Sequence, residues 1–426
     1  MKIIHLHQLF LDSTGVCTDT RKLKKGQLYF ALKGAHFNGN TFAKKALEEG
    51  ASYAILDEDQ GNLDNVILVE DVLHTLQELA TYHRNFLNIP IIGLTGSNGK
   101  TTTKELINSV LSQKYKTTAT AGNLNNHIGV PLTLLSMTKD TEIGIVEMGA
   151  NHQGEIAALS EIARPNFGYI TNFGKAHLEG FGGVEGVIKG KSELYKFISK
   201  TNGIAFVNKE DPLQIKQSSG LEIKTFGPSD ADYTITFKGA TPFVELEYDN
   251  LTIKTQLTGD YNALNISAAI AIGSYFSVDS QAIKNGIERY IPENNRSQII
   301  EKENNTTIIL DAYNANPTSM EAALSNLSKQ SSTHKIAFLG DMFEVGETTK
   351  EEHQHILNYA NSLGIDQVYA VGPTFGILEP SQKKYVVFET YTAFAKAYTK
   401  NIPSNTTILI KGSRGMAMER VLELIK

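Results

Sequence analysis

The sequence has only one cysteine, Cys17, in a chain of 426 residues. A single cysteine excludes an internal disulfide, and it excludes the closely spaced cysteine pairs of structural zinc sites. A fold without disulfides is typical of a reducing compartment. We therefore expect the protein to be cytoplasmic.

Long hydrophobic runs are also lacking. The longest apolar runs have the length of a strand, whereas a membrane-spanning helix needs roughly 20 apolar residues. The N-terminal sequence MKIIHLHQLF is interrupted by polar residues and is followed by no small-residue cleavage site. We expect neither a signal peptide nor insertion into a membrane.

Dense blocks of basic residues are missing too. The 40 lysines and arginines are outnumbered by 46 acidic residues, which gives a formal net charge of -6. Because nucleic-acid-binding surfaces usually appear as clusters of lysine and arginine, this pattern argues against a nucleic-acid partner.

What remains is an ordinary globular composition, with 41% hydrophobic and 20% charged residues. A chain of this length exceeds what one hydrophobic core supports, so we expect two to three domains. Short strand-like runs alternate with helical patterns almost throughout, which is typical of α/β domains with parallel sheets. We therefore predict the α/β fold class.

Three regions of the chain differ in pattern. Residues 1–87 make a small α/β segment with a glycine-rich turn at 33–40, and we assign them to a first domain. Residues 88–297 hold most of the buried strand patterns, which predicts a central domain with a parallel sheet. Residues 298–426 begin a new alternation of strands and helices, which predicts a Rossmann-like C-terminal domain.

Individual elements can be placed within these regions. Three runs at 232–257 alternate apolar and polar residues, so we expect an antiparallel appendage with one solvent-facing side. The other elements expected in the central domain are strands at 89–95, 143–147, 168–171 and 204–207 and a helix at 261–274. The C-terminal strand patterns are TIILDAY, KIAFLGDM, QVYAVG and TILIKGS.

A glycine-rich loop follows the first central strand. Residues 93–104 read GLTGSNGKTTTK, and a helix is predicted to begin at Lys100. Backbone N–H groups of such a turn bind phosphate, the lysine neutralises the β- and γ-phosphates, and the Thr101 hydroxyl is a Mg²⁺ ligand. The strict motif has glycine where this chain has Leu94, so the loop predicts phosphate binding and leaves the reaction open. The residues expected to bind ATP here are Gly96, Ser97, Asn98, Gly99, Lys100, Thr101 and Thr102.

The loop variant TGSNGKTT (95–102) resembles that of the Mur ligase superfamily, which also includes the folylpolyglutamate synthetases. Further motifs in the same order extend the resemblance over essentially the whole chain. The segments DAYNANP and GNLNNHIG favour the branch that adds D-alanyl-D-alanine to a tripeptide. The further motifs are GNLNNHIGVPLTLL (122–135), EMGANHQGEI (147–156), TNFGKAHLEGFG (171–182), DAYNANPTSM (311–320), LGDMFEVG (339–346) and KGSRGMAMER (411–420).

This resemblance implies an ATP-dependent ligase of peptidoglycan synthesis. Its substrates would be UDP-N-acetylmuramoyl-tripeptide and D-alanyl-D-alanine, joined through an acyl phosphate. The first domain would bind UDP, the central domain ATP, and the protein would be a monomer. Whether the tripeptide ends in diaminopimelate or lysine stays open.

The resemblance also implies two Mg²⁺ ions. Glu147, at the end of strand IGIVE, would share one ion with Thr101, and His177 would help to hold the second. Lys191, in GVIKGKSELY, matches a carbamylated lysine, whose added carboxylate is a metal ligand; Lys189 is the alternative in register. The expected catalytic residues are Lys100, Glu147, His177 and Lys191.

The nucleotide contacts follow from the same resemblance. Asn262 and Asn265, in GDYNALNISAA, match residues that contact adenine, since an amide pairs with both donors and acceptors. Helix capping is the alternative for Asn262. Arg296 would contact the ATP phosphates and Asp311 the ribose.

The dipeptide pocket would be lined by three residues of NANPTS, namely Asn314, Asn316 and Ser319. Asn-Pro is also a turn signal, so a structural role can coexist with binding there. Asn125 and Asn126 would face the tripeptide or the incoming dipeptide.

The UDP site would lie in the first domain. Asp19-Thr20-Arg21 and GQLYFALKG (26–34) match the family's N-terminal motif. Thr20 would belong to this site, and Arg21 or Lys33 would pair with the diphosphate.

Three other functions compete with this interpretation. A sibling ligase with another acceptor, such as a folylpolyglutamate synthetase, would share the reaction but not the NANPTS segment. A non-catalytic nucleotide-binding relative would be expected to have lost some of the five residues Lys100, Thr101, Glu147, His177 and Lys191. A GTPase would need a guanine-reading motif, which we do not see.

Overall fold

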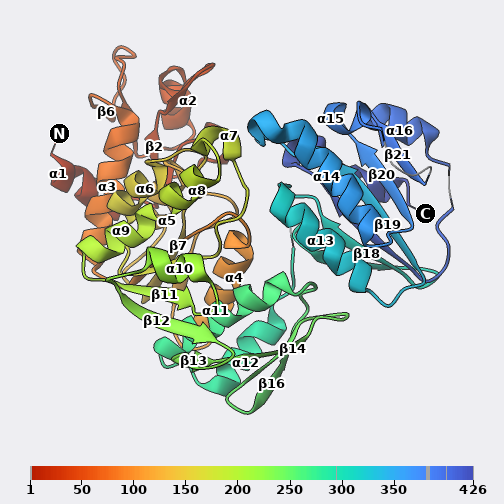
Figure 1. The fold of residues 1–426 in the computed structure, drawn as a ribbon. Coiled ribbons are helices and arrows are strands. Elements are labelled where there is room, and N and C mark those ends of the chain that lie inside the picture. Colours follow the sequence, from red (N-terminus) through yellow and green to blue (C-terminus); the bar gives the residue numbers. More distant parts are fainter. Residues whose placement is uncertain (1, 294, 380–383, 400, 426) are drawn as a thin grey trace.

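The computed structural model describes residues 2–293, 295–379, 384–399 and 401–425. The described chain forms three regions, each built on a sheet of mainly parallel strands with flanking helices (Figure 1). The N-terminal and central regions, red to green in the figure, lie against each other, and the blue C-terminal region stands to one side of them. The predicted α/β fold is confirmed.

The N-terminal region has a four-stranded parallel sheet in the order β1-β2-β5-β6. The glycine-rich turn expected at 33–40 is a short antiparallel hairpin of β3 and β4. The elements are α1 (Ile3–Leu11), β1 (Val16–Cys17), β2 (Leu28–Phe30), β3 (Lys33–Gly34), β4 (Phe37–Asn38), α2 (Ala43–Glu48), β5 (Tyr53–Leu56), β6 (Val66–Leu68) and α3 (Val72–Leu87).

The central region has a seven-stranded parallel sheet in the order β13-β12-β11-β10-β7-β9-β8. The helix predicted from Lys100 is confirmed as α4 (Lys100–Leu111), and it buries Leu106, Ile107, Val110 and Leu111. The strands are β7 (Ile91–Thr95), β8 (Thr117–Ala119), β9 (Ile143–Glu147), β10 (Phe167–Ile170), β11 (Ile204–Asn208) and β12 (Glu222–Gly227). The helices are α5 (Gly129–Leu135), α6 (Glu155–Ala163), α7 (Leu178–Phe181), α8 (Val184–Lys191), α9 (Glu193–Lys200), α10 (Pro212–Gln217), α11 (Tyr261–Tyr275) and α12 (Ser280–Arg289).

The appendage expected at 232–257 needs one correction. Its first run is split, because β13 (Tyr233–Thr234) pairs in parallel with β12 at the edge of the central sheet. Only after the buried residue Ile235 does the chain enter the antiparallel sheet of β14 (Thr236–Gly239), β15 (Glu245–Tyr248) and β16 (Leu251–Lys254). The apolar–polar alternation of the sequence continues through this change of sheet and so gave no sign of it, although Phe237, at an apolar position of the run, is exposed.

The C-terminal region has six strands in the order β17-β18-β22-β19-β20-β21. The four predicted strands are confirmed, and β17 and β21 were not predicted. The last strand in the chain, β22, lies between β18 and β19, so its end meets theirs at the middle of the sheet. The elements are β17 (Gln298–Lys302), β18 (Thr306–Asp311), α13 (Pro317–Lys329), β19 (His334–Gly340), α14 (Thr349–Ser362), β20 (Gln367–Val371), α15 (Pro373–Gly376), β21 (Tyr385–Phe388), α16 (Tyr391–Ala397) and β22 (Thr406–Lys411).

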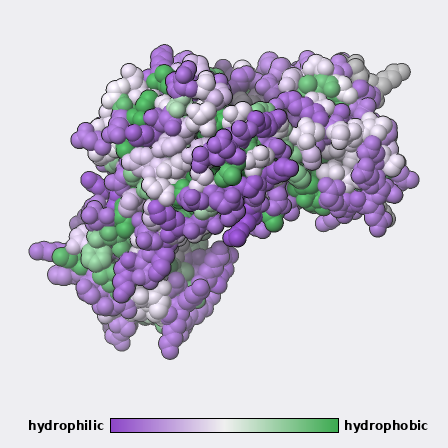
Figure 2. Space-filling model, turned by 90° about the horizontal axis from the view of Figure 1, so that it is seen from below, coloured by the Kyte–Doolittle hydropathy of each residue, from purple (hydrophilic) through white to green (hydrophobic). Residues whose placement is uncertain are grey.

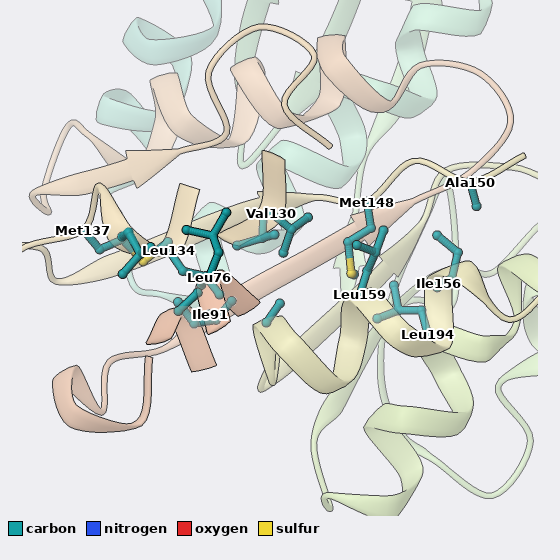
Figure 3. Packing of buried hydrophobic residues seen from close by; sticks show 14 of the residues in the cluster. Leu76, Ile91, Val130, Leu134, Met137, Met148, Ala150, Ile156, Leu159 and Leu194 are labelled. Atoms are coloured by element: carbon teal, nitrogen blue, oxygen red, sulfur yellow. The ribbon is translucent and has the colours of Figure 1, made fainter. Parts of the chain in front are cut away.

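The hydrophobic clusters join the first two regions and leave the third separate. One cluster runs from Leu6 of α1 through Leu76 of α3 to Ile91 of β7. Figure 3 shows this cluster, with Leu76 gathered beside Ile91 and Leu134 of α5. Within the described part of the chain, the two C-terminal clusters contain no residue before Ile299. The C-terminal region therefore meets the others without a shared hydrophobic core.

The surface is mainly hydrophilic. The view in Figure 2 shows small, separate hydrophobic patches among hydrophilic side chains. Among the described residues, no helix has the length and apolar character that crossing a membrane requires.

Candidate active site

A cavity of about 670 Å³ opens where strands β7, β9 and β10 end, and the C-terminal region closes its other side. Ligands of parallel α/β sheets bind at this edge, because the loops that follow the strands and the starts of the next helices converge there. Most predicted site residues line the cavity. They are Ser97, Asn98, Gly99, Lys100, Thr101, Thr102, Asn125, Asn126, Glu147, His177, Asn262, Asn265, Arg296, Asp311, Asn314, Asn316 and Ser319.

The phosphate loop has a conformation that only glycine adopts easily at two points. Gly96 has φ +143°, and a Cβ on it would lie 2.0 Å from Oγ1 of Thr171. Gly99 has φ +79° and caps α4, and a Cβ there would lie 2.5 Å from Oδ1 of Asn265. The loop therefore packs tightly on its neighbours. The N–H groups of Ser97 and Asn98 donate to Asn172, so an anion would bind at the helix N-terminus that follows them.

Lys100 is folded back over this loop. Its Nζ donates to the carbonyl oxygens of Gly96 at 2.7 Å and Ser97 at 3.2 Å. Burial lowers the pKa of Lys100, and the carboxylate of Glu147 acts in the opposite direction. A partly buried lysine at the N-terminus of α4 matches a polyphosphate in charge and position.

Glu147 ends β9 inside the site and is buried. Its Oε1 accepts hydrogen bonds from Thr101 Oγ1 at 3.2 Å and from Asn125 Nδ2 at 2.7 Å. Its Oε2 is buried and has no hydrogen-bond partner among the described residues. An orphaned carboxylate oxygen beside a threonine hydroxyl fits a hard divalent cation such as Mg²⁺, which prefers oxygen ligands.

Lys191 is fully buried at the end of α8 and does not line the cavity, whereas Lys189 on the same helix is exposed. Its Nζ donates to the carbonyl oxygen of Ala150 at 3.2 Å and lies 4.8 Å from the centre of the Phe181 ring. Among the described residues, no carboxylate lies within 4.0 Å of it. Burial lowers the pKa of Lys191 well below its ordinary value, and the charge of Lys100 lowers it further. A neutral amine is the form that reacts with CO₂, and burial favours that form over the ammonium, whereas the charges of Glu155 and Glu193 oppose the shift.

His177 stands at the N-terminus of α7 with φ +53°, an uncommon conformation for a residue other than glycine. Its Nδ1 contacts the carboxylate of Glu344, from the loop after β19. Burial lowers the pKa of His177, although the carboxylate opposes this shift. The region that supplies the carboxylate is the C-terminal one, so this contact crosses between regions.

The described residues contain no cluster of three or more His, Cys, Asp or Glu side chains that could hold a metal ion by themselves. A metal site here would therefore need ligands outside those residue types. Hydroxyl groups, phosphate oxygens and a modified lysine are of that kind.

Asn262 and Asn265 make hydrogen bonds inside the protein and also line the cavity. Asn265 accepts from Thr103 Oγ1 at 3.1 Å and donates to Asn262 Oδ1 at 2.9 Å. Asn262 donates to the carbonyl oxygen of Thr258 at 2.8 Å. The pair thus holds the start of α11 against the phosphate loop, a role that the sequence did not indicate.

Arg296 and Asp311 are each paired with a neighbour that sequence reasoning missed. The guanidinium of Arg296 stacks 3.6 Å above the centre of the Tyr313 ring. Asp311 accepts from Lys411 Nζ at 2.6 Å. Tyr313 and Lys411 both line the cavity. Lys411 lies at the end of a predicted strand, as Glu147 does. This position at a strand end could have identified Lys411 as a candidate site residue.

The start of α13 brings the NANPTS segment to the phosphate loop. Asn316 and Ser319 form a reciprocal capping box, in which each side chain accepts from the backbone N–H of the other, at 2.9 and 3.0 Å. The Asn314 side chain accepts from the backbone of Ala315 at 2.9 Å. The Oδ1 of Asn126 accepts from Gly129 N at 2.9 Å, beside the start of α5. These residues have structural roles beside the cavity that they line.

The residues expected at the UDP site lie elsewhere. Thr20 is buried, and Arg21 is paired with Asp19 through a 2.8 Å contact. Lys33 lies 3.1 Å from Asp57. None of the three predicted residues lines the described cavity.

Comparison with known families gives three matches along the chain. Residues 12–84 match the model of the Mur ligase family catalytic domain. Residues 94–273 match the Mur ligase middle domain, and residues 295–414 match the Mur ligase glutamate ligase domain.

Two curated relatives are similar over nearly the full length. The UDP-N-acetylmuramoyl-tripeptide–D-alanyl-D-alanine ligase of Bacillus subtilis is 35% identical over 424 residues, which cover 96% of this chain and 92% of the relative. The ligase of the same name from Escherichia coli is 34% identical and covers 96% and 93%.

Two solved structures are similar in fold. MurF from Acinetobacter baumannii has a TM-score of 0.87 at 30% identity and covers 98% of this chain and 97% of that one. MurF ligase from Thermotoga maritima, in complex with ADP, has a TM-score of 0.84 at 30% identity and covers 100% and 98%.

Proposed function

The chain belongs to the Mur ligase family, and from this membership we propose that it joins D-alanyl-D-alanine to UDP-N-acetylmuramoyl-tripeptide with ATP. The product is the UDP-linked pentapeptide of peptidoglycan synthesis, and ADP and phosphate are released. The observation that carries the proposal is the near-full-length similarity to ligases of this activity. The cavity agrees with it, because the phosphate loop and the NANPTS helix line the same space.

The first step is transfer of the ATP γ-phosphate to the terminal carboxylate of the tripeptide, which releases ADP. Both reactants are anions, so cationic groups must hold them together. Lys100 and the N–H groups at the start of α4 would neutralise the phosphates, and Arg296, stacked on Tyr313, would add a second cation. The amine of the dipeptide then attacks the acyl phosphate, the carbon–nitrogen bond forms, and phosphate leaves.

Two Mg²⁺ ions would supply further charge neutralisation and hold the phosphate oxygens in line. Thr101 and the unpaired Oε2 of Glu147 would hold the first ion. His177 and a carbamylated Lys191 would hold the second. Carbamylation proceeds from a neutral amine, and the full burial of Lys191, which disfavours the ammonium form, supports the assignment.

The nucleotide would lie between the central and C-terminal regions. Asn262 and Asn265 would face the adenine, although the hydrogen bonds to Thr258 and Thr103 already use part of their capacity. Asp311, fixed by Lys411, would hold the ribose.

The two peptide substrates would bind beside the phosphate loop, in the cavity that these residues line. Asn314, Asn316 and Ser319 would line the D-alanyl-D-alanine pocket. Asn125, which donates to Glu147, would face the tripeptide or the dipeptide together with Asn126.

The N-terminal region would bind the UDP end of the precursor. Thr20 would belong to this site, with Arg21 or Lys33 at the diphosphate. Because both cations are paired with carboxylates, binding would require exchange of those partners for the diphosphate. The domains would divide at 1–87, 88–297 and 298–426, and the protein would be a cytoplasmic monomer.

The decisive experiment measures phosphate release from ATP and Mg²⁺ with UDP-N-acetylmuramoyl-tripeptide, with and without D-alanyl-D-alanine. We expect release only with both substrates, and a pentapeptide product by mass spectrometry. Parallel assays with diaminopimelate- and lysine-containing tripeptides identify the third residue. Release with a different acceptor would favour a sibling ligase, and no release with any acceptor would favour a non-catalytic relative.

A further inference from the structure

The loop that carries His177 reaches the C-terminal region through polar contacts. The backbone N–H of Lys175 donates to Thr318 Oγ1 at 3.0 Å, and its Nζ lies 2.6 Å from Glu352 Oε1. Two residues further on, His177 Nδ1 contacts the carboxylate of Glu344. Because the regions share no hydrophobic cluster, such polar contacts decide how the C-terminal region seats on this loop.

Two backbone hydrogen bonds fix the loop just before Glu344 to its own region. The backbone N–H of Met342 donates to Nε2 of the fully buried His353 at 2.9 Å. The next N–H, of Phe343, donates to Ser413 Oγ at 2.9 Å. Glu344 itself has φ +59°, an uncommon conformation for a residue other than glycine, and its backbone carbonyl oxygen accepts from the N–H of Glu179 at 3.4 Å. The C-terminal region therefore holds the loop just before Glu344.

The contact fixes which ring nitrogen of His177 faces the cavity. A carboxylate only accepts, so Nδ1 carries a proton, and in the neutral ring Nε2 keeps its lone pair. No described residue forms a hydrogen bond with Nε2, and His177 lines the cavity. Histidines that bind metals usually donate their other nitrogen to a carboxylate or carbonyl, which orients the ring.

We propose that Glu344 is a positioning residue, which orients His177 so that the second magnesium site is complete only when the C-terminal region is seated. This inference rests on the proposed role of His177 as a metal ligand. It adds that a ligand in one region is held in place by a carboxylate from another. Metal binding and seating of the C-terminal region then stabilise each other, and ATP would be activated only in the closed arrangement.

The alternative is that the contact is a simple surface ion pair that only helps docking. The chain offers a matched control for it in Glu352, which joins the same two regions through Lys175 but does not touch His177. Substituting Glu352 should remove one docking contact and leave the contact between Glu344 and His177 in place.

The experiment compares Glu344→Ala, Glu344→Gln, Glu352→Ala and His177→Ala with the unmodified enzyme. Free and bound Mn²⁺ are measured by electron paramagnetic resonance, in the presence of ADP and UDP-N-acetylmuramoyl-tripeptide. The Mg²⁺ dependence of phosphate release is measured in parallel. We expect Glu344→Ala to weaken one Mn²⁺ site about 10- to 100-fold, as is typical of lost support to a metal ligand. Glu344→Gln should recover part of the loss, because its amide oxygen still accepts from Nδ1.

Each other result overturns the inference in a distinct way. If His177→Ala keeps unchanged Mn²⁺ binding, the proposed metal role of His177 fails and the inference fails with it. If His177→Ala loses one site and Glu344→Ala does not, only the inference is wrong. If Glu352→Ala weakens the same site as much as Glu344→Ala does, the effect is docking and not orientation. Phosphate release by the unmodified enzyme tests the ligase reaction independently of all three.

Discussion

The side-chain amide of Asn316 donates a 2.7 Å hydrogen bond to Oδ1 of Asn98, and so joins the first turn of α13 to the phosphate loop. The two residues are 218 positions apart in the chain. Asn316 also accepts from the backbone N–H of Ser319 as the N-cap of α13. One side chain therefore both caps the start of α13 and links the C-terminal region to the predicted nucleotide site.

The two roles of Asn316 are separable by substitution. Asn316→Asp keeps an oxygen that can cap the helix, but it loses the donor to Asn98 and places a negative charge near the phosphates. We therefore expect kcat/KM to fall about tenfold or more, with little change in Tm. Asn316→Ala should also lose about 1 kcal/mol of stability with the cap, seen as a fall in Tm of a few degrees. Asp279→Ala, which removes the cap of α12 away from the cavity, serves as control and should lower Tm alone. Unchanged kinetics in Asn316→Asp would show that the link to Asn98 is dispensable.

Lys191 offers a test of its proposed modification. Lys191→Ala should lose nearly all ligase activity and regain part of it with added short carboxylates, because they replace the carboxylate of the carbamate. Lys189→Ala is the matched control, since Lys189 lies exposed on the same helix and should tolerate the change. Intact-mass measurement under bicarbonate gives an independent readout. Full activity of Lys191→Ala would contradict the assignment.

The pair His7 and His83 predicts acid sensitivity of the packing between α1 and α3. His83 Nε2 lies 2.9 Å from the carbonyl oxygen of Met137, which only accepts, so its Nδ1 must accept the 3.0 Å hydrogen bond from His7 Nε2. Protonating His83 turns that acceptor into a second donor and breaks the bond. Burial lowers the pKa of both rings.

The direction of the pH effect follows from these lowered pKa values. Below the ordinary histidine pKa of about 6.5, the unfolded chain binds more protons than the folded chain. The stability that the neutral histidine pair contributes is therefore fully present above that pH. It declines as the pH falls from there toward the lowered folded-state pKa values, by about 1.4 kcal/mol per pH unit for each excess proton. Urea midpoints at pH 8 and pH 5.5 should show the loss. His83→Gln, which cannot titrate, should show a shallower dependence, and an equal slope in both proteins would contradict the prediction.

Gly96 should not tolerate any side chain. Gly96→Ala places a Cβ against Thr171 at the tightest point of the loop, so ATP binding should weaken at least 100-fold. Gly61→Ala is the control, because Gly61 also has positive φ, at +81°, but has open space around its Cβ. It should cost about 1 kcal/mol of stability and leave nucleotide affinity unchanged. Calorimetric titration with a nucleotide measures the affinity of both variants. Equal affinities of Gly96→Ala and the unmodified protein would mean that the loop shifts to accept the methyl group.

Several features were predictable because their signals are local. The start of α4 at Lys100, its buried face and the strand that ends at Glu147 each depend on residues within one or two turns. Hydrophobic periodicity records which face is buried, so helices and strands could be placed from it. The candidate residues that line the cavity came from motifs that resemble those of the Mur ligase family, and some of these motifs lie at such strand ends.

Other features had no local signal. The split at Ile235, the insertion of β22 between β18 and β19, and the internal hydrogen bonds of Asn262 and Asn265 depend on partners far away in the chain. Lys411 lies at the end of a predicted strand, but nothing near it in the sequence identified its partner, Asp311, which lies 100 residues earlier.

The amino-acid sequence by itself determined the α/β class, the phosphate loop and the chemistry that the motifs carry, because each arises from contacts between neighbours in the chain. Only the tertiary structure decided that Lys191 is buried without a carboxylate, that Glu344 holds His177, and that the C-terminal region docks through polar contacts. These features depend on which surfaces pack against each other and exclude water after folding. Such burial is decided by the arrangement of all the elements and not by any local segment.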